Sequence, residues 1–351
     1  MKRYAIFILL PLIIISGIFA IYICRPDLEP VNQPTTVRLY CDSDKPMIET
    51  LEEYASELAD DKYEGRESGY EGNRKAAKYI ASKFKEFGLK PMGDDGTYFQ
   101  NFIFNSPYAT VLPSGHTEIY TANVVGMFEG SDPILKNEIV VVGAHFDHVG
   151  MHTTGYHYGR LGSSGFDNIY NGADDNASGT AVIMVMAKVL KSWGLKRSVI
   201  FIAFSGEEAG LHGSKYYCSN PPRYVDIAKH IFMLNMDMVG RNPHKPVQVE
   251  GVGSADGDIL RDIVKVSLSH ANLRANIADG VTVSGGDSDH SSFRDIGVPY
   301  TFFFTGFHPD YHRTSDHAEK LAYDLMAKEV HAAVHIVADI ANLPERLNFK
   351  K

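Results

Sequence analysis

Cysteine and clustered basic residues are both scarce in this sequence. Only three of the 351 residues are cysteine, which excludes a disulfide-dense scaffold and a cysteine-rich zinc module. The 34 basic residues are outnumbered by 43 acidic ones, giving a net charge of −9, and no cluster of lysine and arginine suits the phosphates of nucleic acid. We therefore expect no nucleic-acid partner. Hydrophobic residues make up 44% of the chain, enough for the core of an ordinary globular protein.

The twenty residues from Tyr4 to Ile23 carry no charged side chain, and they directly follow Lys2 and Arg3. Twenty helical residues span about 30 Å, the thickness of the hydrocarbon core of a membrane. The basic residues should stay in the cytoplasm, so residues 1–25 predict a membrane anchor with the rest of the chain outside the cytoplasm. The alternative is a cleaved signal segment, which would make the protein periplasmic or secreted. Both interpretations predict export.

Residues 26–45 contain three prolines with polar neighbours and are interpreted as a linker. No second linker, repeat or low-complexity stretch follows, so we expect one domain over residues 46–351. The cysteines outside the apolar segment are Cys41 and Cys218, which an exported protein could join in a disulfide. The sequence leaves open whether they pair or remain free thiols.

Short β-branched or aromatic runs alternate with helical patterns along this domain. Such runs are typical of strands that are buried on both faces of a sheet. The alternation predicts an α/β fold with a mixed, largely parallel central sheet and helices on both faces. Ligands in such folds collect beyond the carboxyl ends of the strands. Strands are expected at 139–142, 199–202, 231–234 and 300–304, and helices at 73–87, 180–193, 259–268 and 321–340.

One polar cluster follows the first of these strands, and a second precedes the helix expected from residue 180. A His-x-Asp-His motif offers an imidazole ligand and a carboxylate that can hold the other ring nitrogen. Two adjacent aspartates, Asp174 and Asp175, then precede the next helix and suggest a metal-bridging carboxylate. Each cluster alone has an ordinary explanation, because surface loops and helix caps contain the same residues. The first motif consists of His145, Phe146, Asp147 and His148.

Further carboxylates and histidines follow the later strands. Glu207 and Glu208 come directly after a strand, where one can bind a metal while the other acts as a base toward water. Asp237 ends an apolar strand between two methionines, and burying it without a partner would be costly. Near the C-terminus three histidines compete, and spacing alone does not choose among His308, His312 and His317.

The joint occurrence of these clusters at successive strand ends predicts a metal site. Two imidazoles and three carboxylates are the ligand set of a two-metal hydrolytic centre, with zinc as the preferred ion. Calcium would prefer oxygen ligands alone.

With these motifs, the sequence resembles the di-zinc exopeptidases of metallopeptidase clan MH, such as the secreted bacterial leucyl aminopeptidases. The similarity runs from Leu51 to Leu343 and includes five motifs in the order and approximate spacing of that family. The resemblance implies the zinc-exopeptidase (phosphorylase/hydrolase-like) fold. The motifs are Gly-Ala-His-Phe-Asp-His, Gly-Ala-Asp-Asp-Asn-Ala-Ser-Gly, Ser-Gly-Glu-Glu-Ala-Gly, Asn-Met-Asp-Met and Tyr-His-Arg-Thr-Ser-Asp, and the Gly65-Arg66 region precedes them.

The resemblance implies two zinc ions per chain. His145 and Asp237 would hold one zinc, Glu208 and His312 would hold the other, and Asp175 would bridge the two. Asp175 is chosen over Asp174 because the bridging residue of the family lies three positions before the serine of Ala-Ser-Gly. Likewise, His312 is chosen because the family ligand follows a tyrosine and precedes x-Thr.

The family also implies roles for two acidic side chains that are not zinc ligands. Asp147 would orient His145, and Glu207 would be the general base that deprotonates the attacking water and later protonates the leaving amine. The family has a cis peptide after the bridging aspartate, which would be the Asp175–Asn176 bond here.

One segment departs from the family pattern. Residues 151–170 form a longer stretch than in the compact secreted enzymes, and we expect a rim over the pocket in which His152 and His157 are ordinary loop residues. The expected function is an aminopeptidase that releases N-terminal residues from peptide substrates. The alternatives are a carboxypeptidase, a glutaminyl-cyclase-like enzyme, and a non-catalytic ectodomain like the transferrin-receptor relatives. The oligomeric state and the preferred side chain are left open.

Overall fold

The computed structural model describes residues 44–105, 117–152, 160–161, 167–222, 225–280 and 287–350. The predicted anchor at residues 1–25, almost all of the linker, Cys41 and His157 lie outside these residues. Within the described part of the chain, no helix has the length and apolar character needed to cross a membrane. Cys218 is buried.

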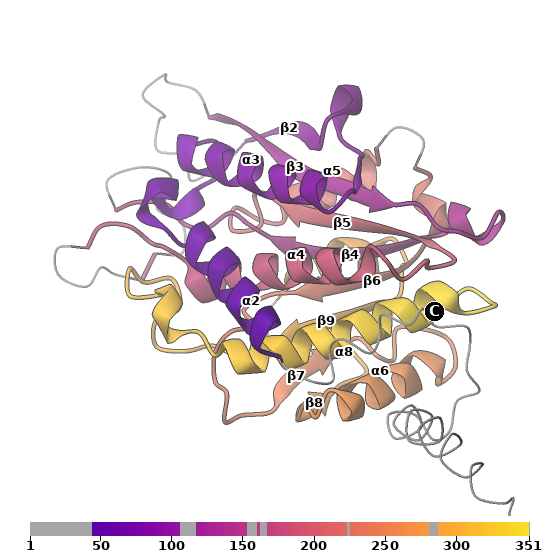
Figure 1. Ribbon diagram of the computed structural model, residues 1–351. Coiled ribbons are helices and arrows are strands. Elements are labelled where there is room, and N and C mark those ends of the chain that lie inside the picture. The colour runs from indigo at the N-terminus through magenta and orange to yellow at the C-terminus, as the bar shows by residue number, and fades with distance from the viewer. Residues whose placement is uncertain are drawn as a thin grey trace, which may run out of the picture.

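A single mixed sheet forms the centre of the described domain (Figure 1). Its strands lie in the order β1-β3-β5-β4-β6-β9-β7-β8, and β2 pairs with β3 outside this path. The four middle strands β5, β4, β6 and β9 are parallel, whereas β3 and β7 join them in antiparallel orientation. The strands are β1 (Lys90–Pro91), β2 (Phe99–Asn105), β3 (Glu118–Phe128), β4 (Ile139–His145), β5 (Ser198–Phe204), β6 (His230–Met236), β7 (Val247–Glu250), β8 (Ala275–Ile277) and β9 (Tyr300–Phe304).

Helices cover both faces of the sheet, as predicted. Figure 1 shows α2, α4 and α8 over the near face, and α5 and α7 pack against the opposite face. Shorter helical turns connect these elements, including η2 (Asp61–Arg66) and η5 (Ala173–Ser178). The α-helices are α2 (Lys45–Leu58), α3 (Glu71–Glu86), α4 (Gly179–Leu190), α5 (His212–Ser219), α6 (Ile259–His270), α7 (His290–Asp295) and α8 (Tyr323–Asn342).

The middle strands are apolar throughout because each buries side chains on both faces. In β4, Val140 and Val142 belong to the core under α4 and α8, while Val141 belongs to the core under α5 and α7. Strand β5 alternates in the same way. This pattern fixes the register of the strands. The register in turn sets the position of the residue that follows each strand.

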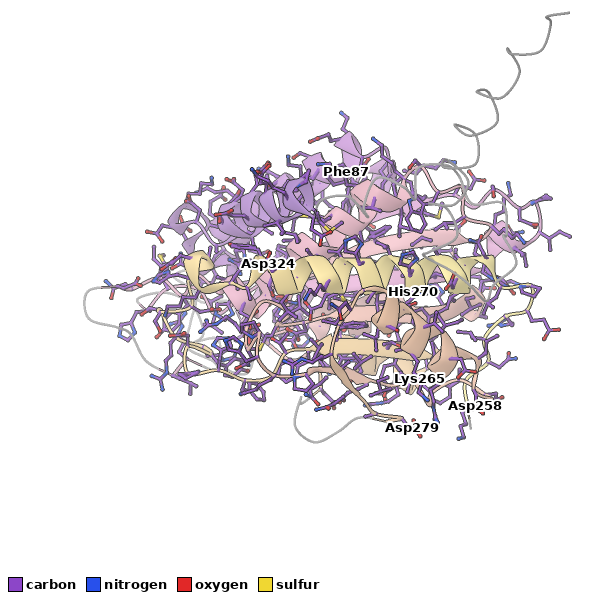
Figure 2. The ribbon with its side chains drawn as sticks, turned by 60° about the horizontal axis from the view of Figure 1, so that its bottom comes forward. Phe87, Asp258, Lys265, His270, Asp279 and Asp324 are labelled. Carbon is purple, nitrogen blue, oxygen red and sulfur yellow. The ribbon has the colours of Figure 1, made fainter. Side chains whose placement is uncertain are left out.

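All of the predicted strands and helices are present, with ends shifted by a few residues. Helix α3 ends where expected, since Gly88 adopts a φ of +83° directly after it. Helix α6 packs beside α8 and directs Asp258 and Lys265 outward, as Figure 2 shows. Strands β1, β2, β3, β7 and β8 were not predicted. In β2 and the first half of β3, buried and more exposed residues alternate instead of forming an apolar run.

Candidate metal centre and active site

The parallel strands bring three of the polar clusters to one edge of the sheet. His145 is the last residue of β4, and Glu207 and Glu208 lie three and four residues after the end of β5. Asp237 follows directly after β6. Because β4 lies between β5 and β6, the three clusters are neighbours at the carboxyl edge. The topology thus converts three distant positions in the sequence into one site.

The first donor group consists of His145, Glu207 and Asp237. Nε2 of His145 lies 3.3 Å from Oδ1 of Asp237. His145 is almost completely buried, Asp237 is buried, and Glu207 is partly exposed. Two ligands of a tetrahedral zinc ion at 2.0–2.1 Å each lie roughly 3.4 Å apart, so this pair has the spacing that a zinc ion requires.

The second donor group consists of His148, Asp175, Glu208 and His312. Nε2 of His312 lies 2.9 Å from Oδ2 of Asp175 and 3.1 Å from Oε2 of Glu208. All four side chains are buried. His312 itself has a φ of +53°, a backbone conformation that few residues other than glycine adopt.

Asp175 lies between the two donor groups. Its Oδ1 is 3.4 Å from Nε2 of His145, and its Oδ2 is 2.9 Å from Nε2 of His312. The two oxygens of one carboxylate therefore face histidines of different groups, which is the arrangement of a bridging ligand. The peptide bond between Asp175 and Asn176 is cis, as the resemblance implies.

The alternative candidates Asp174, His308 and His317 contact groups other than the two donor groups. Asp174 accepts a hydrogen bond from the Gly240 N–H at 2.6 Å, and its other oxygen lies 3.1 Å from His308. His317 lies 3.3 Å from Asp167 in the rim segment. The structure thus brings Asp175 and His312 into the donor groups and leaves Asp174, His308 and His317 outside them.

The electrostatics of the second group favour a cation. Burial alone would lower the pKa of His312, but the carboxylates of Glu208 and Asp175 outweigh it and raise the pKa to about 11. Burial opposes ionisation of Glu208, yet His312 and His148 hold its pKa well below the usual range. The donor set therefore holds positive charge at this place. Buried carboxylates and imidazoles at zinc-ligand spacing fit a divalent metal, and zinc suits this mixture of nitrogen and oxygen.

Glu207 has the opposite electrostatic behaviour from Glu208. Burial raises its pKa well above that of an exposed glutamate; His145 opposes this shift, while Glu208 and Asp237 reinforce it. Its main-chain N–H donates to Oδ1 of Asp147 at 3.2 Å, which fixes the loop that carries it. Two adjacent glutamates thus occupy different environments, one beside histidines and one beside carboxylates.

Asp147 contacts His145 in a way that differs in detail from the expectation. Nδ1 of His145 donates to the main-chain carbonyl oxygen of Asp147 at 3.1 Å, whereas the carboxylate oxygen Oδ1 lies 3.8 Å away. The carboxylate accepts instead from Glu207 and, at 3.3 Å, from the hydroxyl of Ser68. Asp147 therefore orients the histidine through its backbone and the Glu207 loop through its side chain.

Several residues that sequence analysis did not single out hold the ligands in place. Ser288 donates to Oδ2 of Asp237 at 2.7 Å and accepts from Asn235 at 2.9 Å. Asp316 accepts from the main-chain N–H of Asp175 at 3.2 Å. These contacts join segments that are 51 and 141 residues apart, so no local sequence signal could have revealed them.

The ends of the 151–170 segment lie beside the second donor group. Leu161 donates from its main-chain N–H to the carbonyl oxygen of His312 at 2.9 Å, and Arg313 donates back to the Leu161 carbonyl oxygen at 3.2 Å. Met151 and Ile169 form an antiparallel bridge at the base of the segment. The described residues of this segment thus adjoin the second donor group, whereas residues 153–159 and 162–166 lie outside the described residues and the expected rim stays a prediction.

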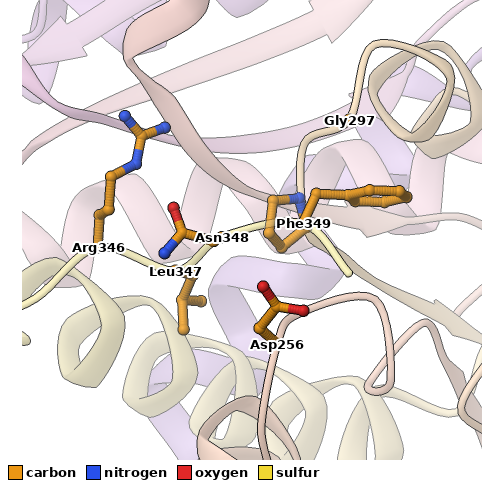
Figure 3. Close-up of a pocket in the computed structure, with 7 residues that line it drawn as sticks. Asp256, Gly297, Arg346, Leu347, Asn348 and Phe349 are labelled. Carbon is orange, nitrogen blue, oxygen red and sulfur yellow. The ribbon is translucent and has the colours of Figure 1, made fainter. Parts of the chain in front are cut away.

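A separate surface pocket of about 470 Å³ lies between the C-terminal tail and the turn before β9 (Figure 3). Its lining includes Asp256, Arg346 and Phe349, but no histidine and no second carboxylate. The pocket lies before β9, away from the carboxyl edge where the donor groups meet. It therefore takes no part in the metal centre.

The fold and the paired histidine–carboxylate groups define an α/β protein with the donor set of a metallohydrolase. The chain belongs to peptidase family M28, whose model matches residues 123–337, more than half of the chain. Aminopeptidase YwaD of Bacillus subtilis (strain 168) is 29% identical over 239 residues, which are 64% of this chain and 48% of that protein. The chain thus spans about half the length of the curated relatives it matches. The family resemblance is confirmed.

Solved structures confirm the predicted fold. The crystal structure of BSAP, a zinc aminopeptidase from Bacillus subtilis, has a TM-score of 0.64 at 17% identity, covering 87% of this chain and 98% of that chain. A glutaminyl cyclase from Bacteroides thetaiotaomicron, bound to N-acetylhistamine, has a TM-score of 0.62 at 17% identity, with coverages of 83% and 97%. Because both kinds of protein share the fold, the side chains of the site must distinguish their chemistries.

Proposed function

We propose that this chain is a zinc-dependent aminopeptidase that binds two zinc ions and releases N-terminal residues from peptides. The observation that carries the proposal is the position of Asp175, whose two oxygens face His145 on one side and His312 on the other. Asp237 completes the first group and Glu208 the second. The donor set therefore serves two cations, with Asp175 shared between them.

His145 and Asp237 would hold one zinc ion, Glu208 and His312 the other, and Asp175 both; the chemistry supplied there would be polarisation of the scissile carbonyl group and acidification of a water molecule. The protein supplies the proton transfers. Glu207 lies in the first group beside His145 and Asp237, where its carboxylate can serve as the base toward water. It accepts the proton of the attacking water at its carboxylate and delivers that proton to the leaving amine. Asp147 fixes the Glu207 main chain during both transfers.

The alternative activities differ either in the end of the peptide that the site recognises or in the reaction performed at the N-terminal end. A carboxypeptidase needs a cation for the substrate carboxylate, and a glutaminyl cyclase works with a single zinc. The complete first group of His145 and Asp237 favours the two-zinc chemistry over the cyclase. The presence of both donor groups together with Glu207 favours an enzyme over a non-catalytic ectodomain.

The test is release of p-nitroaniline from a panel of Xaa-p-nitroanilides and their N-acetylated counterparts by the full-length chain. An aminopeptidase hydrolyses the unblocked compounds alone, loses activity with a chelator and regains it with zinc. Peptides with free carboxyl ends or N-terminal glutamine are included as matched substrates for the alternatives. Activity restricted to either of those would contradict the proposal, and so would hydrolysis of the acetylated compounds.

The proposed location of the enzyme is outside the cytoplasm. The uncharged run of Tyr4 to Ile23 is longer than the roughly 7–15 apolar residues of a signal peptide, which favours an anchored domain over a cleaved and secreted one. Lys2 and Arg3 before it favour a domain outside the cytoplasm. Peptides outside the cytoplasm would then be the substrates. A protease that cannot cross the membrane should digest the domain on intact cells or spheroplasts, and protection from it would contradict this placement.

A further inference from the structure

His148 is the member of the second donor group to which the preceding mechanism gives no role. It follows Asp147 in the His-x-Asp-His motif, and only 1% of its surface is exposed. Its Nδ1 lies 2.7 Å from Oε1 of Glu208 and 3.8 Å from Oδ2 of Asp175. The short contact is a hydrogen bond to one specific oxygen of a ligand carboxylate.

The two oxygens of Glu208 have different partners. Oε1 contacts His148, whereas Oε2 lies 3.1 Å from Nε2 of His312. A carboxylate whose first oxygen is held by a hydrogen bond presents its second oxygen to a metal. In most zinc sites a carboxylate accepts a hydrogen bond from a histidine that binds the metal. Here the roles are reversed, because a histidine donates to a carboxylate that would bind the metal.

The surroundings of the His148 ring decide which nitrogen carries the proton. Its Nε2 is buried and has no hydrogen-bond partner among the described residues. A proton on Nε2 would therefore leave a buried donor unsatisfied, at a cost of about 1–3 kcal/mol. A proton on Nδ1 is donated to Glu208. The neutral ring thus favours the Nδ1–H form, which makes it a hydrogen-bond donor and leaves no lone pair on Nδ1 for a metal.

The loop that carries Asp175 also fixes the orientation of the ring. A side chain at Gly172 would place its Cβ 2.5 Å from ring atoms Cγ and Cδ2 of His148, so the ring lies directly on this glycine. The ring also meets His312 edge-on, with 5.4 Å between centroids and 75° between planes. The His148 ring is thus packed against the loop of one proposed ligand and the ring of another.

We propose that His148 is a positioning residue of the second zinc site, where its Nδ1–H holds Oε1 of Glu208 and leaves Oε2 to the cation shared with His312 and Asp175. This inference rests on the proposed two-zinc function. Its consequence is selective, because His148 belongs to the second donor group, where it contacts Glu208 and His312, and not to the first. Loss of the hydrogen bond should therefore weaken one zinc and leave the other unchanged.

The test measures both zinc affinities of the full-length chain by competition with a chromophoric chelator. His148→Ala removes the hydrogen bond, whereas His148→Asn keeps a side-chain N–H close to the position of Nδ1. His230→Gln is the matched control, since His230 is a buried histidine that bonds to Tyr217 outside both groups. His312→Ala identifies which of the two measured affinities belongs to the second site.

We expect His148→Ala to weaken the second zinc by about 10–100-fold and to leave the first unchanged. His148→Asn should retain most of the affinity, and His230→Gln should change neither site. An intact first site in the alanine variant shows that the domain has folded. Equal losses in the alanine and asparagine variants would make the imidazole a direct ligand and overturn the proposal. Unchanged affinity in the alanine variant would overturn it as well.

A wild-type chain that binds only one zinc would contradict the proposed two-zinc function. The affinity for that single zinc would then be compared among the His148 variants, provided that His312→Ala abolishes its binding. The inference stands if alanine weakens this zinc and asparagine does not, and it fails otherwise. Failure of the function and failure of the inference thus give different results.

Discussion

The side chain of Arg66 donates a hydrogen bond to the main-chain carbonyl oxygen of Gly172 at 2.8 Å, within the loop that leads to Asp175. The same guanidinium group, completely buried, donates to the carbonyl oxygens of Leu58, Phe146 and Asn171. It therefore ties the end of α2, the His145 loop and the Asp175 loop together. Burial lowers the pKa of Arg66 to about 10, against the opposing effect of nearby carboxylates such as Asp175, so the group stays charged at neutral pH.

Replacing Arg66 with methionine should strongly destabilise the fold. The substitution keeps much of the buried volume but leaves four buried carbonyl oxygens without this donor. We expect the free energy of unfolding in urea to fall by about 3–5 kcal/mol. Arg74→Met is the control, because Arg74 is exposed and its side chain contacts Glu71 and the Gly69 carbonyl oxygen at the surface; its effect should stay below about 1 kcal/mol. Similar losses in both variants would contradict the role of Arg66.

Glu207→Gln should separate catalysis from metal binding. The amide keeps the size of the side chain but cannot accept the proton of the attacking water. We expect turnover to fall by about 10²–10⁴-fold, while zinc analysis still finds about as much metal as in the wild type. Glu208→Gln is the matched variant, and it should lose zinc as well as turnover. Near-wild-type turnover in the Glu207 variant would show that another group is the base.

Asp175→Ala should prevent the chain from retaining both metals. The carboxylate faces both His145 and His312, so its removal takes a candidate ligand from each group. Zinc content after dialysis, measured by elemental analysis, should fall below that of the wild type. Asp174→Ala is the neighbouring control, since Asp174 contacts Gly240 and His308. Two tightly bound zincs in the Asp175 variant would exclude a bridging role.

Acid should destabilise the metal-free protein through His230. Its Nδ1 lies 3.1 Å from the Ile227 carbonyl oxygen and its Nε2 3.0 Å from the Tyr217 hydroxyl, so both nitrogens of the neutral ring have partners. Burial lowers the pKa of His230 to about 4. In the unfolded chain the ring takes up a proton near pH 6.5, whereas the folded protein resists it down to about pH 4. Stability is therefore lost as the pH falls through this window.

The expected loss from this one group is about 3 kcal/mol between pH 6.5 and pH 4. His230→Gln has no titrating ring, so its unfolding free energy should fall less steeply over that window than that of the wild type. Urea unfolding of chelator-treated protein at several pH values measures both slopes without a contribution from zinc release. Identical slopes would show that His230 does not titrate as the structure implies.

The sequence predicted the positions of β4, β5, β6 and β9 because they are apolar runs, a pattern typical of burial on both faces. It failed to predict β2 and β3, where alternating residues give a weaker signal, and the short strands β1, β7 and β8. The candidate ligands could be placed because each follows a strand or precedes a helix. Family resemblance, and not spacing, chose Asp175 over Asp174 and His312 over its neighbours.

The role of His148 could not be separated from that of His145 by sequence alone. The two histidines share one motif and lie three positions apart. They belong to different donor groups because the chain leaves β4 at His145. Similarly, the contact of Ser288 with Asp237 depends on tertiary packing. Local sequence identifies residue types that can bind metal, whereas the partition into two groups depends on the fold.

The most direct test of the central claim is zinc titration of the chelator-stripped full-length chain, with turnover of one unblocked Xaa-p-nitroanilide measured at each step. The account predicts negligible turnover without metal and full turnover only as zinc content approaches two ions per chain. Turnover that persists in the stripped protein would contradict a metal-dependent aminopeptidase. Absence of turnover at any zinc content, with both sites filled, would contradict the proposed activity.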